Sequence, residues 1–283
     1  MFSILKQIII TSRPFGWIIF MISYLAGFIL TKESLNLQNW LTLLIVGPIL
    51  SFVIYTFNDI YDYGSDILND RKKLLIMGGV LDKKYWSLFQ KISMILIILI
   101  IFTPVWFSNY VGLLCAIFGL FVGLGYSIPP LRLKIKLGGD ILCNSLGFLS
   151  LFVWGLSQNL SANNLFYSLK YALYSTLMVI VWSLLFLTLD YKYDKKAKHK
   201  TTAVRFSQIQ ALIFSGVGYG FCGILMIILF NQIWIAILLE ICSITILFGI
   251  FFKTSRYQIF LAIFVTFLSV VAYSSLYVPI FLK

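Results

Sequence analysis

The apolar run LTLLIVGPILSFVIYTF (residues 41–57) leads directly into the polar run NDIYDYGSD (residues 58–66). The apolar run is close to the ~20 residues that a helix needs to cross the hydrocarbon core of a membrane. The polar run contains Asn58 and three of the ten acidic residues of the chain, namely Asp59, Asp62 and Asp66. The sequence therefore predicts a membrane helix that ends in a cluster of carboxylates.

The composition of the whole chain indicates a membrane protein. Hydrophobic residues make up 60% and charged residues 11% of its 283 residues, and the mean hydropathy is +0.96. A soluble domain averages about 25% charged residues, and the apolar runs are continuous, which excludes the alternating pattern of a β-barrel. The sequence predicts an all-α integral membrane protein that forms one domain over residues 1–283. Nine transmembrane helices are expected at about 15–31, 40–57, 86–107, 110–127, 140–157, 168–189, 207–230, 233–252 and 258–282.

Basic residues predict the orientation of these helices, because cytoplasmic loops carry an excess of Lys and Arg. With the N-terminus inside, 19 of the 22 basic residues fall on the inside, and only Lys32, Lys170 and Lys283 fall outside. We therefore expect a multi-pass protein of the cell membrane with a cytoplasmic N-terminus. Topology and anionic membrane lipids explain most of the net charge of +12, so the charge does not indicate nucleic-acid binding. The oligomeric state stays open.

The spacing of the first acidic cluster places Asp59, Asp62 and Asp66 on one side of a helix, with Asn58 one turn before Asp62. Like charges at this spacing repel one another. A cation is therefore expected between them, and a hard divalent ion is the first candidate. The alternative is a solvated helix end whose charges pair with the neighbouring lysines.

Asp190 and Asp194 form a second acidic pair at the end of the sixth predicted span, on the same side of the membrane. They are four residues apart and share one helical face. Two such clusters suit a diphosphate that is held through Mg²⁺, because this ion prefers a few carboxylates together with phosphate oxygens and its own waters. A solvated helix end is again the alternative.

Basic residues accompany both acidic clusters. They are Arg71, Lys72 and Lys73 after the first cluster, Arg132, Lys134 and Lys136 after Pro129-Pro130, and Lys195, Lys196, Lys198, Lys200 and Arg205 after the second pair. The two prolines end a helix, and an extended strand after them would point the three following cations the same way. Such cations can neutralise a diphosphate and stabilise it as a leaving group. Membrane topology alone is the alternative explanation for them.

These motifs resemble those of the UbiA superfamily of intramembrane prenyltransferases. Asn-Asp-x-x-Asp-x-x-x-Asp (58–66) is similar to its first signature and Asp-x-x-x-Asp (190–194) to its second, while Ser12-Arg13-Pro14 and the stretch 126–134 also match. The resemblance covers essentially the whole chain. It implies nine helices around a central cavity with a cytoplasmic cap. It also implies Mg²⁺-dependent transfer of a prenyl group from an isoprenyl diphosphate to a lipophilic acceptor, either an aromatic quinone precursor or a polyene such as a carotenoid.

The resemblance further implies a role for each matching residue. The first metal site would be formed by Asn58, Asp59, Asp62 and Asp66, and the second by Asp190 and Asp194. Catalysis would depend most on Asp59, Asp62, Asp190 and Asp194. The diphosphate would be bound by Arg71, Lys72, Tyr126, Arg132, Lys134 and Lys198.

Two positions depart from the family pattern. Pro130 stands where many members have Lys four residues after the Tyr, so Arg132 or Lys134 would take that role. Lys198 stands where a third acid is often found, which would lower metal affinity or replace a metal contact by a phosphate contact. The stretches 66–72, 81–82 and 201–204 look closer to the bacterial lycopene-elongase-like branch.

Other features of the sequence bear on the alternatives. Glu240 is an acid within a predicted span, which makes it a functional candidate by default. It would either face the cavity and receive a proton from the acceptor, or pair with a polar neighbour for packing. A membrane transporter of cations or small molecules would place its acids near mid-membrane in broken helices. A phosphatidyltransferase would need an Asp-Gly-x-x-Ala-Arg element, which the sequence lacks. The single histidine, His199, and four scattered cysteines do not suggest a His- or Cys-based metal site.

Overall fold

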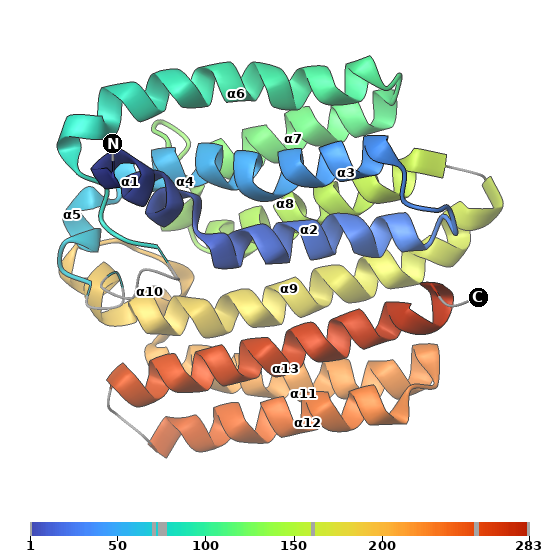
Figure 1. Cartoon of the computed structure of the whole chain (residues 1–283). Coiled ribbons are helices and arrows are strands. Elements are labelled where there is room, and N and C mark those ends of the chain that lie inside the picture. The colour runs from blue at the N-terminus through green and yellow to red at the C-terminus, as the bar shows by residue number, and fades with distance from the viewer. Residues whose placement is uncertain (1, 70–71, 73–77, 160–161, 252–254, 282–283) are drawn as a thin grey trace. The chain divides into compact units, whose positions relative to one another are not determined.

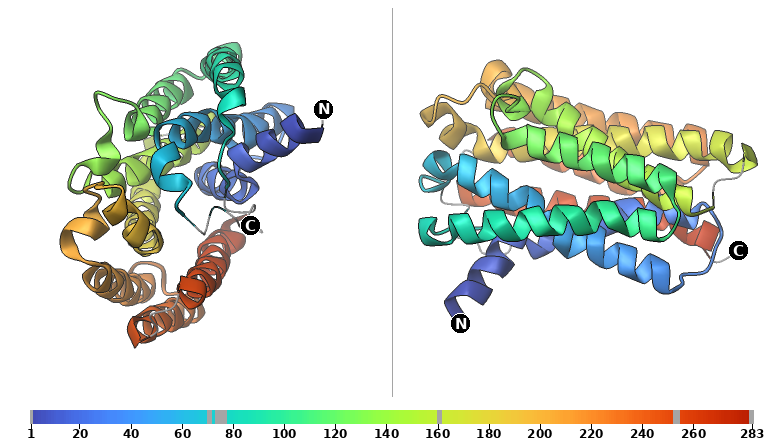
Figure 2. Two further views of the ribbon diagram at one scale, coloured as in Figure 1. Left: turned by 90° about the vertical axis from the view of Figure 1, so that its left-hand side faces the viewer. Right: turned by 90° about the horizontal axis from the view of Figure 1, so that it is seen from above.

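A computed structural model of the chain describes residues 2–69, 72, 78–159, 162–251 and 255–281 (Figures 1 and 2). These residues form helices and the turns between them, and they contain no strand. The chain divides into two compact units, which are described separately. The first contains Met1–Leu133 and Leu146–Asn164, and the second contains Lys134–Ser145 and Leu165–Lys283.

The first unit carries the first acidic cluster. Its helices are α1 (Phe2–Ser12), α2 (Pro14–Ile29), α3 (Leu37–Leu44), the π-helix η1 (Ile45–Ile49), α4 (Leu50–Tyr61), α5 (Tyr63–Asp66), η4 (Lys83–Tyr85), α6 (Trp86–Trp106), α7 (Tyr110–Ser127), the second part of α8 (Gly139–Leu156) and η6 (Ser157–Asn159). Helix α4 packs against α1, α6 and α7. Three helices therefore pack against α4, the helix whose last turn carries Asn58 and Asp59.

Prolines shape the two helices that lead to this cluster. Pro14 is the first residue of α2, where its missing N–H costs no hydrogen bond. The axes of α1 and α2 differ by 42° across Arg13. Pro48 lies within η1, where the helix takes a wider π-helical turn at the residue that has no N–H to donate. Thus α3, η1 and α4 form one span, Leu37–Tyr61, with a π-helical turn in its middle.

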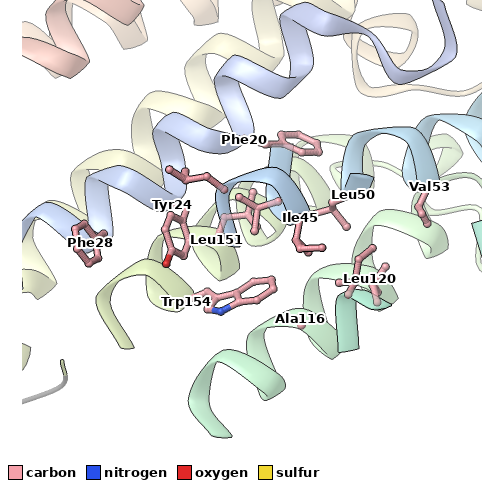
Figure 3. Packing of buried hydrophobic residues seen from close by; sticks show 13 residues of the cluster. Phe20, Tyr24, Phe28, Ile45, Leu50, Val53, Ala116, Leu120, Leu151 and Trp154 are labelled. Atoms are coloured by element: carbon pink, nitrogen blue, oxygen red, sulfur yellow. The ribbon is translucent and has the colours of Figure 1, made fainter. Parts of the chain in front are cut away.

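The hydrophobic core of the first unit joins α2, η1, α4, α6, α7 and α8 (Figure 3). The indole of Trp154 is fully buried and meets the ring of Tyr24 edge to face, at 6.4 Å between ring centres. Helices α2 and α8 approach so closely that a Cβ atom on Gly155 would overlap the backbone carbonyl of Tyr24. Glycine is needed at this crossing because no side chain fits between the two backbones.

The second unit carries the second acidic pair. Its helices are the first part of α8, α9 (Ala162–Lys196), α10 (Thr202–Phe206), α11 (Gln208–Phe230), α12 (Ile233–Phe248), η7 (Gly249–Phe251) and α13 (Ser255–Phe281). Helices α11, α12 and α13 lie side by side (Figure 1). Glu240 of α12 lies against α11, and a Cβ atom on Gly223 would be 2.7 Å from its Oε1.

The predicted spans agree with the helices in position. Eight helices of the described residues are long and apolar enough to cross a membrane, and a ninth is counted if α1 and α2 are taken as one bent span. The expectation of nine spans is thus confirmed only as eight or nine. Helix α9 continues beyond the predicted end of its span at residue 189, so Asp190 and Asp194 are helical residues. The central cavity and the cytoplasmic cap stay predictions.

Candidate active site

The first acidic cluster is buried at the end of α4. Asp59, Asp62 and Asp66 expose only 1%, 4% and 8% of their surface, so the helix end is not solvated, whereas the lysine pairing of that same alternative is present at Lys72. The spacing predicted one continuous helix through the cluster, but the helix is interrupted. Helix α4 ends at Tyr61, and Asp62 lies in a turn before α5. The backbone N–H of Asp62 nevertheless donates to the carbonyl of Asn58, and that of Asp66 to the carbonyl of Asp62, both at 2.9 Å.

Basic side chains of the same unit compensate this buried charge. Lys72 Nζ lies 3.2 Å from Asp59 Oδ1 and 2.9 Å from Asp66 Oδ2, and its own side chain is buried. Arg132 Nη2 lies 3.9 Å from Asp62 Oδ1. The cation expected between the carboxylates is therefore supplied in part by the chain itself, as the pairing alternative predicted for lysine. The predicted ligand Arg71 lies outside the described residues.

Arg13 is the residue of this site that the sequence did not assign to it. It lies between α1 and α2 with a left-handed backbone (φ 50°). Its Nη2 donates to Asp59 Oδ1 at 2.5 Å and to Asn58 Oδ1 at 3.0 Å, and its guanidinium lies over the Tyr55 ring, 4.0 Å from the ring centre. The signal in the sequence was an arginine directly before a helix-starting proline, which was noted only as part of a family pattern.

Asn58 connects the cluster to α7. Its amide nitrogen donates to Asp62 Oδ2 at 2.8 Å and to the hydroxyl of Ser127 at 2.9 Å. Tyr126 is the half-buried neighbour of Ser127 in the last turn of α7. The structure thus brings together most of the residues that the sequence assigned to the first site.

The segment after Pro129-Pro130 is not the extended strand that would point the three cations the same way, so that prediction is wrong. Residues Leu133–Ile135 form a turn of 3₁₀-helix, not an extended strand, and Arg132 has a positive φ of 34°. Lys134 is buried, whereas Lys136 is exposed. A helical turn rotates successive side chains around its axis, which separates residues that a strand would align.

The second acidic pair lies in the last turns of α9. Asp194 is buried, and its Oδ1 lies 3.3 Å from Nδ1 of His199 while its Oδ2 accepts a hydrogen bond of 3.2 Å from the hydroxyl of Thr201. Asp190 is half-buried. Lys198 is exposed and has a left-handed backbone (φ 58°), in the turn that follows the helix.

Two carboxylate clusters with adjacent basic residues at the ends of apolar helices call for comparison with known proteins. The model of the UbiA prenyltransferase family matches residues 20–258. The chain belongs to this family. It is therefore a prenyltransferase, and its apolar helices make it a multi-pass membrane protein.

Individual relatives of this UbiA-family chain are distant. A lycopene elongase/hydratase of Corynebacterium glutamicum is 28% identical over 149 residues, which are 52% of this chain and 50% of the relative. The chain thus spans about half the length of the curated relatives it matches.

Solved structures share the fold over nearly the full length. A UbiA homologue from Archaeoglobus fulgidus bound to GPP and Mg²⁺ has a TM-score of 0.67 at 21% identity, covering 95% of this chain and 99% of that chain. Digeranylgeranylglyceryl phosphate synthase has a TM-score of 0.66 at 18% identity, covering 99% and 98%.

The first cluster offers the donor types that Mg²⁺ prefers. Its carboxylate and amide oxygens are hard ligands, and Asp59 Oδ2 is buried without a hydrogen bond from any described residue. No three His, Cys, Asp or Glu side chains of the described residues come close enough to hold a metal by themselves. The donor types of the cluster and the unsatisfied Asp59 Oδ2 fit Mg²⁺, which binds through few carboxylates and takes phosphate oxygens and waters as its other ligands.

Burial also changes the acidity of one member of the cluster. Asp66 lies beyond the last residue of the membrane span, in α5. Removal from water raises the pKa of its carboxyl to about 6, an effect that Lys72 opposes and that the charges of Asp59 and Asp62 reinforce. Part of the cluster thus titrates only about one unit below neutral pH.

Proposed function

We propose that this UbiA-family prenyltransferase transfers the prenyl group of an isoprenyl diphosphate to a lipophilic acceptor within the cell membrane, and that the reaction depends on Mg²⁺. The observation that supports this most directly is a set of three buried carboxylates at the end of an apolar span, in contact with the half-buried Arg13 and the buried Lys72. A site that carries both signs of charge suits a ligand made of a metal cation and a phosphate anion.

In this proposal the acidic residues bind the metal. Asn58, Asp59, Asp62 and Asp66 form the first site, and Asp190 and Asp194 contribute a second one. Bound Mg²⁺ would supply a Lewis acid that draws charge from the diphosphate oxygens. Arg13 holds the carboxylate of Asp59 and the amide of Asn58 in a fixed orientation, since its guanidinium contacts both and rests on the Tyr55 ring.

The basic residues bind the diphosphate and stabilise it as it leaves. Lys72 is the best supported of them, because it already lies within 3.2 Å of two carboxylates and could exchange one of these contacts for a phosphate oxygen. The others are Arg71, Tyr126, Arg132, Lys134 and Lys198. Charge that develops on the leaving group is stabilised most by donors that are held in place before the reaction.

The acceptor is proposed by class. A lycopene elongase/hydratase among the relatives favours a polyene such as a carotenoid, and an aromatic quinone precursor is the second candidate. The homologue from Archaeoglobus fulgidus was solved with GPP and with DMAPP, so short allylic diphosphates are the first donors to test. We place the site residues on the cytoplasmic side, because the basic residues of the chain gather there in the predicted topology.

The test is release of pyrophosphate by purified protein in lipid nanodiscs. The protein receives Mg²⁺, geranyl or dimethylallyl diphosphate, and either a carotenoid or an aromatic quinone precursor. Asp62→Asn should abolish Mg²⁺-dependent release while the protein still inserts into the membrane. Asp82→Asn is the matched control, since this acid of the same unit is exposed and pairs at the surface with Lys84. Wild-type turnover in Asp62→Asn would refute the site assignment.

A further inference from the structure

Asp140, the second residue of α8, is a fully buried carboxylate that belongs to neither acidic motif. Its Oδ2 accepts a hydrogen bond of 2.7 Å from the backbone N–H of Thr202, and its Oδ1 accepts from the hydroxyl of Thr202 and from the N–H of Ile141. The hydroxyl of Thr202 also accepts from the N–H of Gly138 at 3.0 Å. Both oxygens of Asp140 are therefore used, and two of the three hydrogen bonds that they accept come from Thr202.

These bonds fix the segment that follows α9. Thr202 is the first residue of α10, and Thr201 before it donates its hydroxyl to Asp194 Oδ2 at 3.2 Å. His199 reaches Asp194 with its side chain at 3.3 Å, and its backbone N–H donates to the carbonyl of Asp194. The chain thus folds back on the end of α9, so that residues 199–201 contact the second acidic motif. All of these residues belong to the second unit.

We propose that Asp140 is a positioning residue for the second acidic motif. It holds the backbone of Thr202, and through Thr201 it fixes the orientation in which Asp194 presents its carboxylate to metal and diphosphate. The inference rests on the proposed function. A carboxylate oxygen that accepts one hydrogen bond keeps a further lone pair, so the bond from Thr201 leaves Asp194 able to bind a cation. Partners of this kind orient metal ligands, and their loss typically costs about 10–100-fold in metal affinity.

The contacts explain why an ionised aspartate is suited to this position. Thr202 presents two donors, its N–H and its O–H, to the two oxygens of one carboxylate. In Asp140→Asn one of these oxygens becomes an NH₂ group, which would face a donor and leave it without an acceptor. Such a buried unpaired donor is unfavourable, and the Thr202 backbone would have to move away from it.

The experiment measures binding of geranyl S-thiolodiphosphate, which is not cleaved, to full-length protein in nanodiscs at increasing Mg²⁺ concentration. Asp140→Asn and Thr202→Val should each raise the Mg²⁺ concentration needed for half-maximal binding by about tenfold or more. Thr202→Ser keeps the hydroxyl, so its Mg²⁺ requirement should equal that of the wild-type protein. The double variant Asp140→Asn, Thr202→Val should need no more Mg²⁺ than Asp140→Asn alone, because both substitutions break the same hydrogen bonds. If Asp140→Asn does not fold, Thr202→Val carries the test.

Two further variants separate positioning from stability and from the proposed function. Ser215→Ala removes a buried hydrogen bond to the carbonyl of Val181 in the same unit, so it should lower the melting temperature without changing the Mg²⁺ requirement. An equal change in the Mg²⁺ requirement of Ser215→Ala, or a wild-type requirement in both Asp140→Asn and Thr202→Val, would overturn the positioning role. Wild-type binding by Asp194→Asn would instead show that the proposed second metal site is wrong.

Discussion

Lys72 offers the sharpest test of how the first acidic cluster is held together. Its Nζ lies 2.9 Å from Asp66 Oδ2 and 3.2 Å from Asp59 Oδ1, and the three side chains are almost fully buried. At 2.9 Å and an effective dielectric constant of 20, one such attraction is about 6 kcal/mol before desolvation is subtracted. Removing one partner of a buried pair leaves an uncompensated charge and typically costs about 3–5 kcal/mol.

The perturbation is Lys72→Met, which keeps much of the apolar stem and removes the charge. We expect its free energy of unfolding to fall by about 3 kcal/mol, at the lower end of that range, because Arg13 still pairs with Asp59. The double variant Lys72→Met, Asp66→Asn should recover part of the loss, since it also removes the carboxylate left without a partner. The assay is the melting temperature of detergent-solubilised protein, followed by the loss of its monodisperse chromatographic peak.

Lys84→Met is the matched control. Lys84 Nζ lies 3.1 Å from Asp82 Oδ2, a distance similar to that of the buried pair, but their side chains are 63% and 57% exposed. Exposed pairs contribute little because water and salt screen them, so this variant should melt like the wild-type protein. If Lys72→Met melts at the wild-type temperature, or if both variants lose the same amount, the role assigned to burial is refuted.

Three further predictions concern acidity, packing and the metal. Burial raises the pKa of Asp66 to about 6, above the ordinary value of about 3.9; the contribution of this group to stability is therefore present at low pH and lost as the pH rises through about 6. Mg²⁺ binds the ionised form, so the rise in melting temperature that Mg²⁺ causes should weaken below pH 6, and Asp66→Asn should lack this pH dependence. Gly155→Ala should destabilise the protein by roughly 1–3 kcal/mol because its Cβ overlaps the backbone of α2, whereas Gly147→Ala, on the same helix with no atom within 4 Å of its Cβ, should melt like wild type; equal melting of the two would contradict the close packing. EDTA should stop pyrophosphate release and added Mg²⁺ should restore it, while activity that persists in EDTA would contradict the proposed metal dependence.

The membrane helices could be predicted from the sequence because hydrophobic length alone specifies them. An apolar run of about 20 residues has few alternatives to a membrane helix. Hydropathy does not mark the end of α9, since a helix can continue through polar residues into water. The spacing of Asp190 and Asp194 nevertheless predicted that both are helical, as the structure confirms. The π-helical turn at Pro48 was also missed, because proline in an apolar run predicts a kink but not the form that it takes.

The sequence predicted which acidic residues form the candidate site, but it did not predict which basic residues contact them. Spacing identified the carboxylates, but it could not show that Lys72 and Arg13 lie among them, because these partners are 13 and 46 residues away from Asp59. The role of Asp140 could not be predicted for the same reason, since its partner Thr202 is 62 residues further along the chain. Helical periodicity describes neighbours within two turns, and tertiary packing decides the rest.

The π-helical turn Ile45–Ile49 has a consequence for how the length of this chain can change. A π-turn contains one residue more than an α-turn, so it absorbs an inserted residue that would otherwise rotate everything after it by about 100°. Deletion of one residue from this turn would return the helix to α geometry and leave Asp59 on the face that meets Arg13. A deletion three turns later, next to the carboxylates, would rotate the residues after it, because no π-helical turn lies there to absorb the change. During evolution, the second span could therefore gain or lose a residue in the middle of the membrane while its functional end kept the same register.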